Sequence, residues 1–159
     1  MIDLSVIRDI VAIMSFVIGL SYYIITVQNQ NRARKAQVLL SIQNSYHNMD
    51  AMSKTYETYT WEWDDYDDFE EKYGSDNNPQ AMLMRITDWY WYNNVGLMLK
   101  NRLIDEEMTY DSMGADIITY WERWESIIRE QRSRYFTDEY MEFMEYLAKR
   151  MKKVRNKRK

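Results

Sequence analysis

The chain of 159 residues carries 21 Lys and Arg against 25 Asp and Glu, so its net charge is −4 at pH 7. It contains no Cys and a single His, which excludes disulfides, thiolate metal sites, thiol nucleophiles and metal sites built from several histidines. One Pro and four Gly indicate long helices joined by few turns.

The first feature along the chain is an uncharged run of 22 residues, Ile10–Asn31, whose first 18 positions are mostly apolar. As a helix, those positions span roughly 27 Å, close to the hydrocarbon thickness of a bilayer. A cleaved signal peptide would need a basic start and small residues at a cleavage site, and a core helix rarely runs this far without a charge. We therefore predict a transmembrane anchor over residues 1–31.

The basic residues that flank this run predict its orientation. Arg32, Arg34 and Lys35 follow it directly, whereas only Arg8 and the terminal amine precede it. The positive-inside rule then places the N-terminus outside and the rest of the chain in the cytoplasm. We expect a single-pass protein of the cell (inner or plasma) membrane, with these three residues at the lipid surface. Ser15 and Gly19 form a small-xxx-small pair, which makes a homo-oligomer possible.

Residues 32–148 are predicted to form a cytoplasmic helical domain, with 12 basic and 23 acidic side chains. A heptad-like seam opens the domain, and its members are Leu39, Ile42, Tyr46, Met49, Ser53, Tyr56 and Thr60. Apart from Gly19, no helix breaker lies between residues 10 and 61, so we expect one continuous rod of about 50 residues. His47 lies one position off the seam and is interpreted as a half-exposed side chain with no partner nearby in the sequence.

The segment from Glu57 to Asp76 is acidic and rich in turn-forming residues, so a loop with short helical pieces is expected. Asn78 and Pro79 then form a helix start, and the helix that they open should reach Lys100. Its predicted apolar stripe consists of Met82, Leu83, Ile86, Trp89, Tyr90, Leu97 and Met98.

Two more helices are predicted before residue 135. Asp105 caps a short helix through Met113, which Gly114 is expected to end. The next helix ends near Arg134, and its predicted buried positions are Ile117, Ile118, Trp121, Trp124, Ile127 and Ile128.

The last predicted helix opens at Thr137 as cap, with Phe136 packed against Met141. Its stripe consists of Tyr140, Phe143, Met144, Leu147 and Met151. No segment shows the alternation of a strand. The predicted fold is therefore all-α: an N-terminal transmembrane helix that continues into a cytoplasmic antiparallel helical bundle.

An acidic cluster in the 57–76 segment is the first candidate site. Its carboxylates could attract Ca²⁺ or Mg²⁺, but no frame offers the Gly and Glu positions of an EF-hand loop. We interpret it as a solvated loop that docks onto a basic partner or onto the basic tail of this chain. The residues assigned to this contact are Asp64, Asp65, Asp67 and Asp68.

A basic tail over residues 149–159 is the second candidate site, with eight basic and no acidic residues. The tail could bind anionic lipid, could bind the phosphates of RNA or DNA, or could have no dedicated partner. The lipid interpretation is favoured because the basic residues after the anchor would face the same membrane. The residues of this site are Lys149, Arg150, Lys152, Lys153, Arg155, Lys157, Arg158 and Lys159.

No pattern in the sequence supports a specific reaction. A Gly-rich phosphate loop, a nucleophile elbow and a kinase signature are all missing, and no Glu-x-x-His motif suggests a di-iron site. We therefore expect no enzyme activity, no cofactor and no metal. The predicted function is that of an accessory or scaffold subunit in a membrane-associated complex, bound to lipid and to protein partners. The alternative is a membrane-tethered binder of nucleic acid or the ribosome, acting through the basic tail.

Short motifs along nearly the whole chain carry a resemblance to a known family. These motifs are Arg34-Lys35-Ala36-Gln37, Asp67-Asp68-Phe69-Glu70-Glu71-Lys72-Tyr73-Gly74, Asn94-Val95-Gly96-Leu97, Leu103-Ile104-Asp105, Trp121-Glu122 and Glu145-Tyr146-Leu147-Ala148. The chain resembles an uncharacterised prokaryotic family of small membrane-anchored helical proteins, catalogued as a domain of unknown function. The resemblance implies an anchored α-helical protein and assigns no catalytic or binding residue.

Overall fold

The computed structural model describes residues 4–46 and 49–159, and only the backbone of residues 49–51. This described part of the chain contains six helices and no strand, which confirms the all-α prediction. His47, singled out in the sequence, lies outside the described residues.

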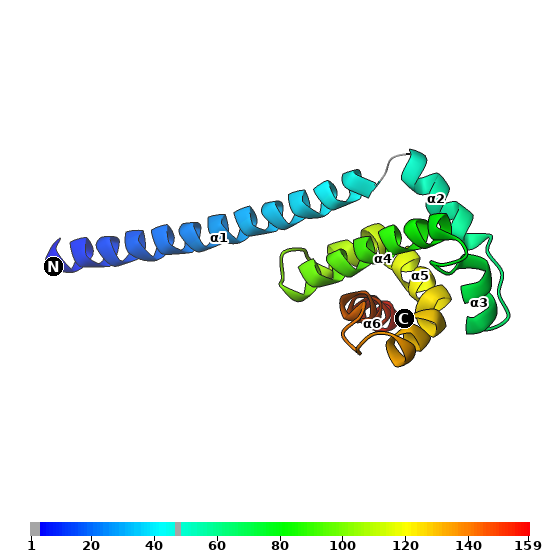
Figure 1. The fold of residues 1–159 in the computed structure, drawn as a ribbon. Helices are drawn as coiled ribbons and strands as arrows, with labels where there is room; N and C mark the ends of the chain where they lie inside the picture. The colour runs from blue at the N-terminus through cyan, green and yellow to red at the C-terminus, as the bar shows by residue number, and fades with distance from the viewer. Residues whose placement is uncertain (1–3, 47–48) are drawn as a thin grey trace.

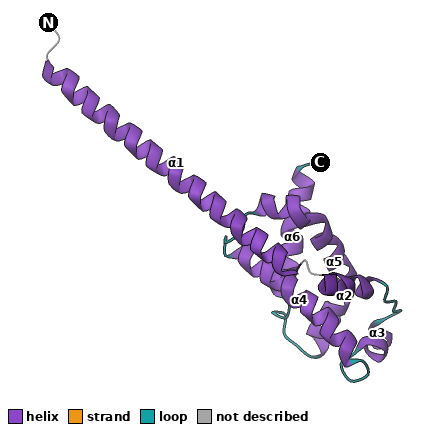
Figure 2. Ribbon diagram, turned by 90° about the horizontal axis from the view of Figure 1, so that it is seen from above, coloured by secondary structure: helices purple, strands orange, loops and turns teal. Residues whose placement is uncertain are grey.

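Helix α1 (Leu4–Tyr46) projects from a bundle formed by the other five helices, with the N-terminus at the end far from the bundle (Figures 1 and 2). Its 43 residues span about 64 Å. The expected rod of about 50 residues is wrong in its length, because α2 (Met49–Tyr59) runs in a different direction from α1 (Figure 1). The predicted seam is therefore divided between two helices.

The next two helices confirm two predictions from the sequence: a short helical piece in the acidic segment, and a helix that starts after an Asn-Pro cap. Helix α3 (Tyr66–Tyr73) lies in the acidic segment and is capped by Asp65. Helix α4 (Pro79–Lys100) is capped by Asn78, whose side chain accepts a hydrogen bond from the Ala81 N–H.

The buried face of α4 differs from the predicted stripe. Leu83, Tyr90 and Leu97 are exposed, whereas Trp89 is fully buried. The buried residues of the helix are Ala81, Arg85, Asp88, Trp89, Tyr92, Val95, Gly96 and Leu99. Two charged residues belong to this face, so a stripe drawn through apolar residues alone is rotated away from it.

Helix α5 (Glu106–Arg134) is a single helix of 29 residues, so the predicted break at Gly114 is wrong. Asp105 caps it as expected, and its side chain accepts a hydrogen bond from the Met108 N–H. Gly114 is buried under the ring of Tyr110, where an added Cβ would lie 2.5 Å from a ring carbon. This glycine therefore makes room for a neighbouring ring within the helix. All six predicted apolar positions of this helix are buried.

Helix α6 (Glu142–Lys157) begins later than predicted, because Thr137 lies in a turn rather than at a cap. Met141 precedes the helix with a left-handed backbone (φ 57°) and no side-chain cap, and Phe136 stacks on Tyr140 instead of Met141. The helix runs through residue 149, so the predicted basic tail is instead its second half. Met151 and Val154, within that segment, are buried.

The core is aromatic and centres on Trp124 of α5, whose side chain is fully buried. Rings from three other segments meet it: Trp61 and Trp63 before α3, Phe69 of α3 and Trp89 of α4. Helix α6 packs most extensively against both α4 and α5. Aromatic contacts on one side and α6 on the other therefore hold α4 and α5 in one body.

Candidate functional site

The N-terminal part of α1 is an apolar surface that no other part of the described chain covers. Its large apolar side chains are exposed from Leu4 to Ile25, and its most apolar 18-residue window has no buried residue. The helix is long and apolar enough to cross a membrane. Gly19 has no neighbour within 4 Å, and the Ser15 hydroxyl donates to the Val11 carbonyl at 2.8 Å. The core of this chain therefore leaves the apolar segment uncovered.

The basic residues after this segment lie just before α1 meets the bundle. Arg32 and Arg34 are exposed and Lys35 is half-buried. One turn later Leu39 is only 5% exposed, and Val38 packs against the same core. The three cations thus lie between the apolar segment and the bundle.

A buried carboxylate joins α1 to the bundle. Asp88 of α4 accepts hydrogen bonds from the hydroxyls of Tyr46 (2.9 Å), Thr55 (3.1 Å) and Tyr120 (3.4 Å), which belong to α1, α2 and α5. We call these four residues the junction cluster. The Tyr46 ring also stacks on Trp91 at 4.2 Å. The end of α1 is therefore held by polar and aromatic contacts together.

No cation pairs with Asp88 in the described part of the chain, although this carboxylate is only 4% exposed. Burial raises the pKa of Asp88, and the hydrogen bonds from Tyr46, Thr55 and Tyr120 lower it only in part. Burial also raises the pKa values of Tyr46 and Tyr120 above the ordinary value of a tyrosine. At neutral pH the tyrosines are therefore neutral hydrogen-bond donors rather than bases.

A cavity of about 430 Å³ lies beside the junction cluster, between α1, α2, α4 and α5. Its lining residues include Tyr46, Met52, Tyr56, Trp91 and Asp116. The volume and the mixed aromatic and polar lining suit a small ligand or an inserted side chain. Thr55 of the junction cluster, whose hydroxyl donates to Asp88, also lines this cavity.

Four of the eight cations of the predicted basic tail pair with acidic residues of this chain. Lys149 pairs with Glu145 at 2.8 Å and Lys152 with Glu122 at 3.0 Å. Arg150 pairs with Glu106, and Arg158 with Glu107 and Asp111. The other cations of α6 and the C-terminus make no ion pair within the described chain: Lys153, Arg155, Lys157 and Lys159.

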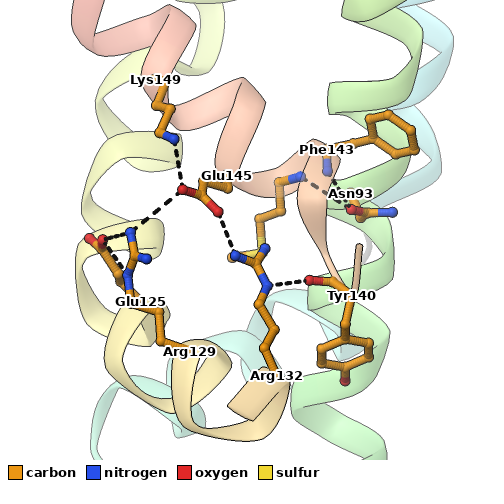
Figure 3. Close-up of polar contacts among 9 residues, drawn as sticks. Asn93, Glu125, Arg129, Arg132, Tyr140, Phe143, Glu145 and Lys149 are labelled. Carbon is orange, nitrogen blue, oxygen red and sulfur yellow. Dashed lines mark hydrogen bonds and ion pairs between the residues drawn. The ribbon is translucent and has the colours of Figure 1, made fainter. Parts of the chain in front are cut away.

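One of these paired cations, Lys149, belongs to a polar network at the start of α6 (Figure 3). Glu145 accepts from Arg132 at 2.6 Å and pairs with Lys149 at 2.8 Å and Arg129 at 3.5 Å (Figure 3). Burial alone would raise the pKa of Glu145, but the hydrogen bonds from Lys149 and Arg132 outweigh it and lower the pKa. Arg132 and Arg129 thus join α5 to Glu145 of α6, while Lys149 pairs with Glu145 inside α6.

The four acidic residues assigned to partner binding contact their own segment and the end of α5. Asp65 caps α3 by accepting from the Asp68 N–H at 2.9 Å, and Asp68 accepts from the Asp64 N–H and from Lys72. Asp67 pairs with Arg134. The observed partners of the loop are thus Lys72 and Arg134 of α5, while the paired cations of the predicted basic tail contact other acids.

Sequence reasoning missed the buried polar residues of α4. Arg85 and Asp88 are 3% and 4% exposed, and Asn93 accepts hydrogen bonds from the Phe143 and Met144 N–H groups of α6 (Figure 3). The signal available in the sequence was two opposite charges three positions apart, Arg85 and Asp88, among the apolar residues of this helix. In the described residues no group of three His, Cys, Asp or Glu side chains is placed to hold a metal ion.

Comparison with known proteins gives one family. The model of the family described as "Domain of unknown function (DUF4760)" matches residues 9–151, most of the chain. No curated protein and no solved structure matches it. In the motifs that carry the resemblance, Asp105 caps α5, and Gly96, Leu147 and Ala148 are buried in the bundle.

Proposed function

The chain belongs to the DUF4760 family, whose function is unknown. We propose that it is a single-pass membrane protein whose helical domain is an accessory or scaffold subunit of a membrane-associated complex. The observation that carries the proposal is the uncovered apolar surface of α1, attached to a bundle with a complete aromatic core. A bilayer is the natural cover for an uncharged helical segment of this length.

The proposed orientation places the N-terminus outside and the bundle in the cytoplasm. Arg32, Arg34 and Lys35 support it, because they lie on the bundle side of the apolar segment, where a cytoplasmic leaflet would present anionic headgroups. Four cations at the end of the chain without ion pairs would add to lipid binding if this end of the bundle reaches the surface: Lys153, Arg155, Lys157 and Lys159.

The scaffold role is supported by how the bundle is attached. The junction cluster fixes the end of α1 to α2, α4 and α5, so the anchor would hold the bundle in a defined position. Protein partners would meet the exposed acidic surface of Asp64, Asp65 and Asp67. The pair Ser15 and Gly19 on the exposed surface of α1 would allow a second copy to pack in the membrane.

Membrane attachment is tested by flotation with lipid vesicles followed by alkaline carbonate washing. We expect the full chain to float and to resist the wash, and a chain of residues 32–159 to stay in the soluble fraction at physiological salt. Release of the full chain by carbonate would contradict a membrane-spanning anchor.

The scaffold role is tested by the size of the native assembly after extraction in mild detergent. We expect the protein to elute with partners, and the Asp64→Asn, Asp65→Asn, Asp67→Asn and Asp68→Asn combination to reduce their retention. Asp138→Asn with Glu139→Gln is the matched control, since both acids are exposed in another loop. A stable monomer that retains no partner from its native membrane would contradict the proposal.

A second candidate, nucleic-acid or ribosome binding, rests on the four cations that lack ion pairs at the end of the chain. If each met one phosphate, a plot of log K against log salt concentration would have a slope of roughly −3 to −4. Replacing Lys153, Arg155, Lys157 and Lys159 with Gln should then abolish binding. RNA binding that does not change in this variant would exclude the candidate.

A further inference from the structure

Arg85 of α4 is a buried cation without an anionic partner. Its side chain is 3% exposed, and the guanidinium forms no hydrogen bond or ion pair within the described residues. The rings of Phe69 and Trp89 lie 5.1 and 5.0 Å from it. Such cation–π contacts offset part of the cost of burying a charge, but they satisfy none of the five N–H donors.

Arg85 lines a cavity of about 330 Å³, distinct from the one beside the junction cluster. Met82, Ile86 and Tyr140 form apolar and aromatic walls. Tyr135 and Phe136, which are 66% and 52% exposed, also line it. The volume is at the lower end for ligand sites, so it suits a small molecule.

The side-chain oxygen of Gln131 is a second polar atom without a hydrogen-bond partner at the same cavity. Gln131 is 5% exposed, and its amide N–H donates to Glu70 Oε1 at 3.4 Å. This hydrogen bond fixes the orientation of the amide, and its oxygen Oε1 is buried with no donor. Glu70 Oε1 also accepts from the Tyr66 hydroxyl at 2.8 Å. The cavity therefore offers a free cation and a free acceptor beside a carboxylate.

We propose that this cavity binds a small zwitterion of the amino-acid type with an apolar or aromatic side chain. The carboxylate pairs with Arg85, the ammonium group donates to Gln131 Oε1 next to Glu70, and the side chain packs on the aromatic walls. A simple anion fits less well because Glu70 and Asp76 also line the cavity, and a simple cation leaves Arg85 unpaired. The site is independent of membrane anchoring.

The test is isothermal titration of the full chain in detergent with L-phenylalanine as probe. Two analogues each lack one charge: phenethylamine has no carboxylate, and 3-phenylpropionate has no ammonium group. We expect phenylalanine to bind and each analogue to bind at least about tenfold more weakly, since each loses a charge-assisted hydrogen bond. No binding of phenylalanine at about 10 mM, or equal binding of either analogue, overturns the proposal.

Variants locate the site. Arg85→Met should abolish binding while circular dichroism stays native, and unchanged affinity in this variant overturns the proposal. Phe136→Ala, at an exposed wall residue, tests the site even if Arg85→Met does not fold. It should weaken phenylalanine binding about fivefold through loss of an aromatic contact. Tyr90→Ala, an exposed aromatic of α4 outside the cavity, is the control and should leave affinity unchanged. If Phe136→Ala and Tyr90→Ala bind phenylalanine with equal affinity, the proposal is overturned.

Discussion

Replacement of Asn93 tests how α6 is held, because this side chain replaces the missing cap of that helix. Its oxygen accepts from the N–H groups of Phe143 at 3.1 Å and Met144 at 3.2 Å, across the interface between α4 and α6 (Figure 3). Met141, at the cap position, makes no side-chain hydrogen bond. Asn93→Ala leaves both N–H groups of the first turn without their acceptor.

The magnitude follows from those two hydrogen bonds. Loss of a cap costs about 0.5–2 kcal/mol, and a typical intramolecular hydrogen bond contributes about 1 kcal/mol. Met144 is only 2% exposed, so water cannot readily replace the acceptor at its N–H. We therefore expect Asn93→Ala to lower the free energy of unfolding by about 2 kcal/mol, which for a chain of this size lowers Tm by about 4–8 °C.

The assay is thermal unfolding of the full chain in detergent, followed by near-ultraviolet circular dichroism of the aromatic core. Asn93→Asp keeps the acceptor and adds a negative charge at a helix N-terminus, so it should retain or raise Tm. Asn94→Ala is the matched control, since its neighbouring side chain is exposed. If Asn93→Ala and Asn94→Ala unfold within about 0.5 kcal/mol of each other, the capping role is refuted.

Three further predictions concern the junction cluster, the approach of α6 to α4 and the network of Figure 3. Burial raises the pKa of Asp88, so the ionised carboxylate costs stability above that pKa. In urea unfolding at pH 7, Asp88→Asn should therefore match or exceed the native protein, while Asp88→Ala, which removes the acceptor, should lose about 1–3 kcal/mol; equal effects would contradict this. A Cβ on Gly96 would lie 1.9 Å from the Phe143 carbonyl oxygen, so Gly96→Ala should destabilise the bundle by at least about 1–3 kcal/mol, whereas Gly19→Ala, with nothing within 4 Å, should not. The pKa of Glu145 is lowered in the folded state, so its contribution is present above the unfolded pKa of about 4.3 and is lost as pH falls through the folded value. Glu145→Gln should thus be less stable at pH 7 and lose less stability between about pH 5 and 3; an unchanged pH profile would contradict this.

The parts of the fold that follow local rules could be predicted from the sequence. Asn78 before Pro79 and Asp105 before two glutamates are caps, and the structure has helices starting after each. The buried face of α5 was also predictable, because its apolar residues repeat at helical spacing and face one core.

The features that depend on tertiary contacts could not be predicted. The start of α6 depends on Asn93, which lies 50 residues before Phe143. Gly114 looks like a helix breaker in the sequence, yet it makes room for the ring of Tyr110 inside a continuous helix. Local propensity contains no information on either contact.

In the candidate sites, too, features set by local composition could be predicted, whereas features set by contacts between helices could not. The apolar run of α1 is a compositional feature and was predictable, together with the cations that follow it. Arg85 and Asp88 are absent from the predicted apolar stripe of α4, although both are buried. Residues 149–159 were predicted as one lipid-binding basic tail, but Arg150 and Arg158 of this segment pair with acids of α5. Pairing across helices depends on the fold and is not visible as composition.

The central claim is that α1 spans a membrane with the bundle in the cytoplasm, and the absence of Cys allows a direct test. Single cysteines at Ser5, before the apolar segment, and at Ser133, exposed on α5, can be labelled with a membrane-impermeant maleimide in sealed right-side-out vesicles. We predict labelling of Ser5→Cys in intact vesicles and labelling of Ser133→Cys only after detergent is added. Labelling of Ser133→Cys in intact vesicles would contradict the claim.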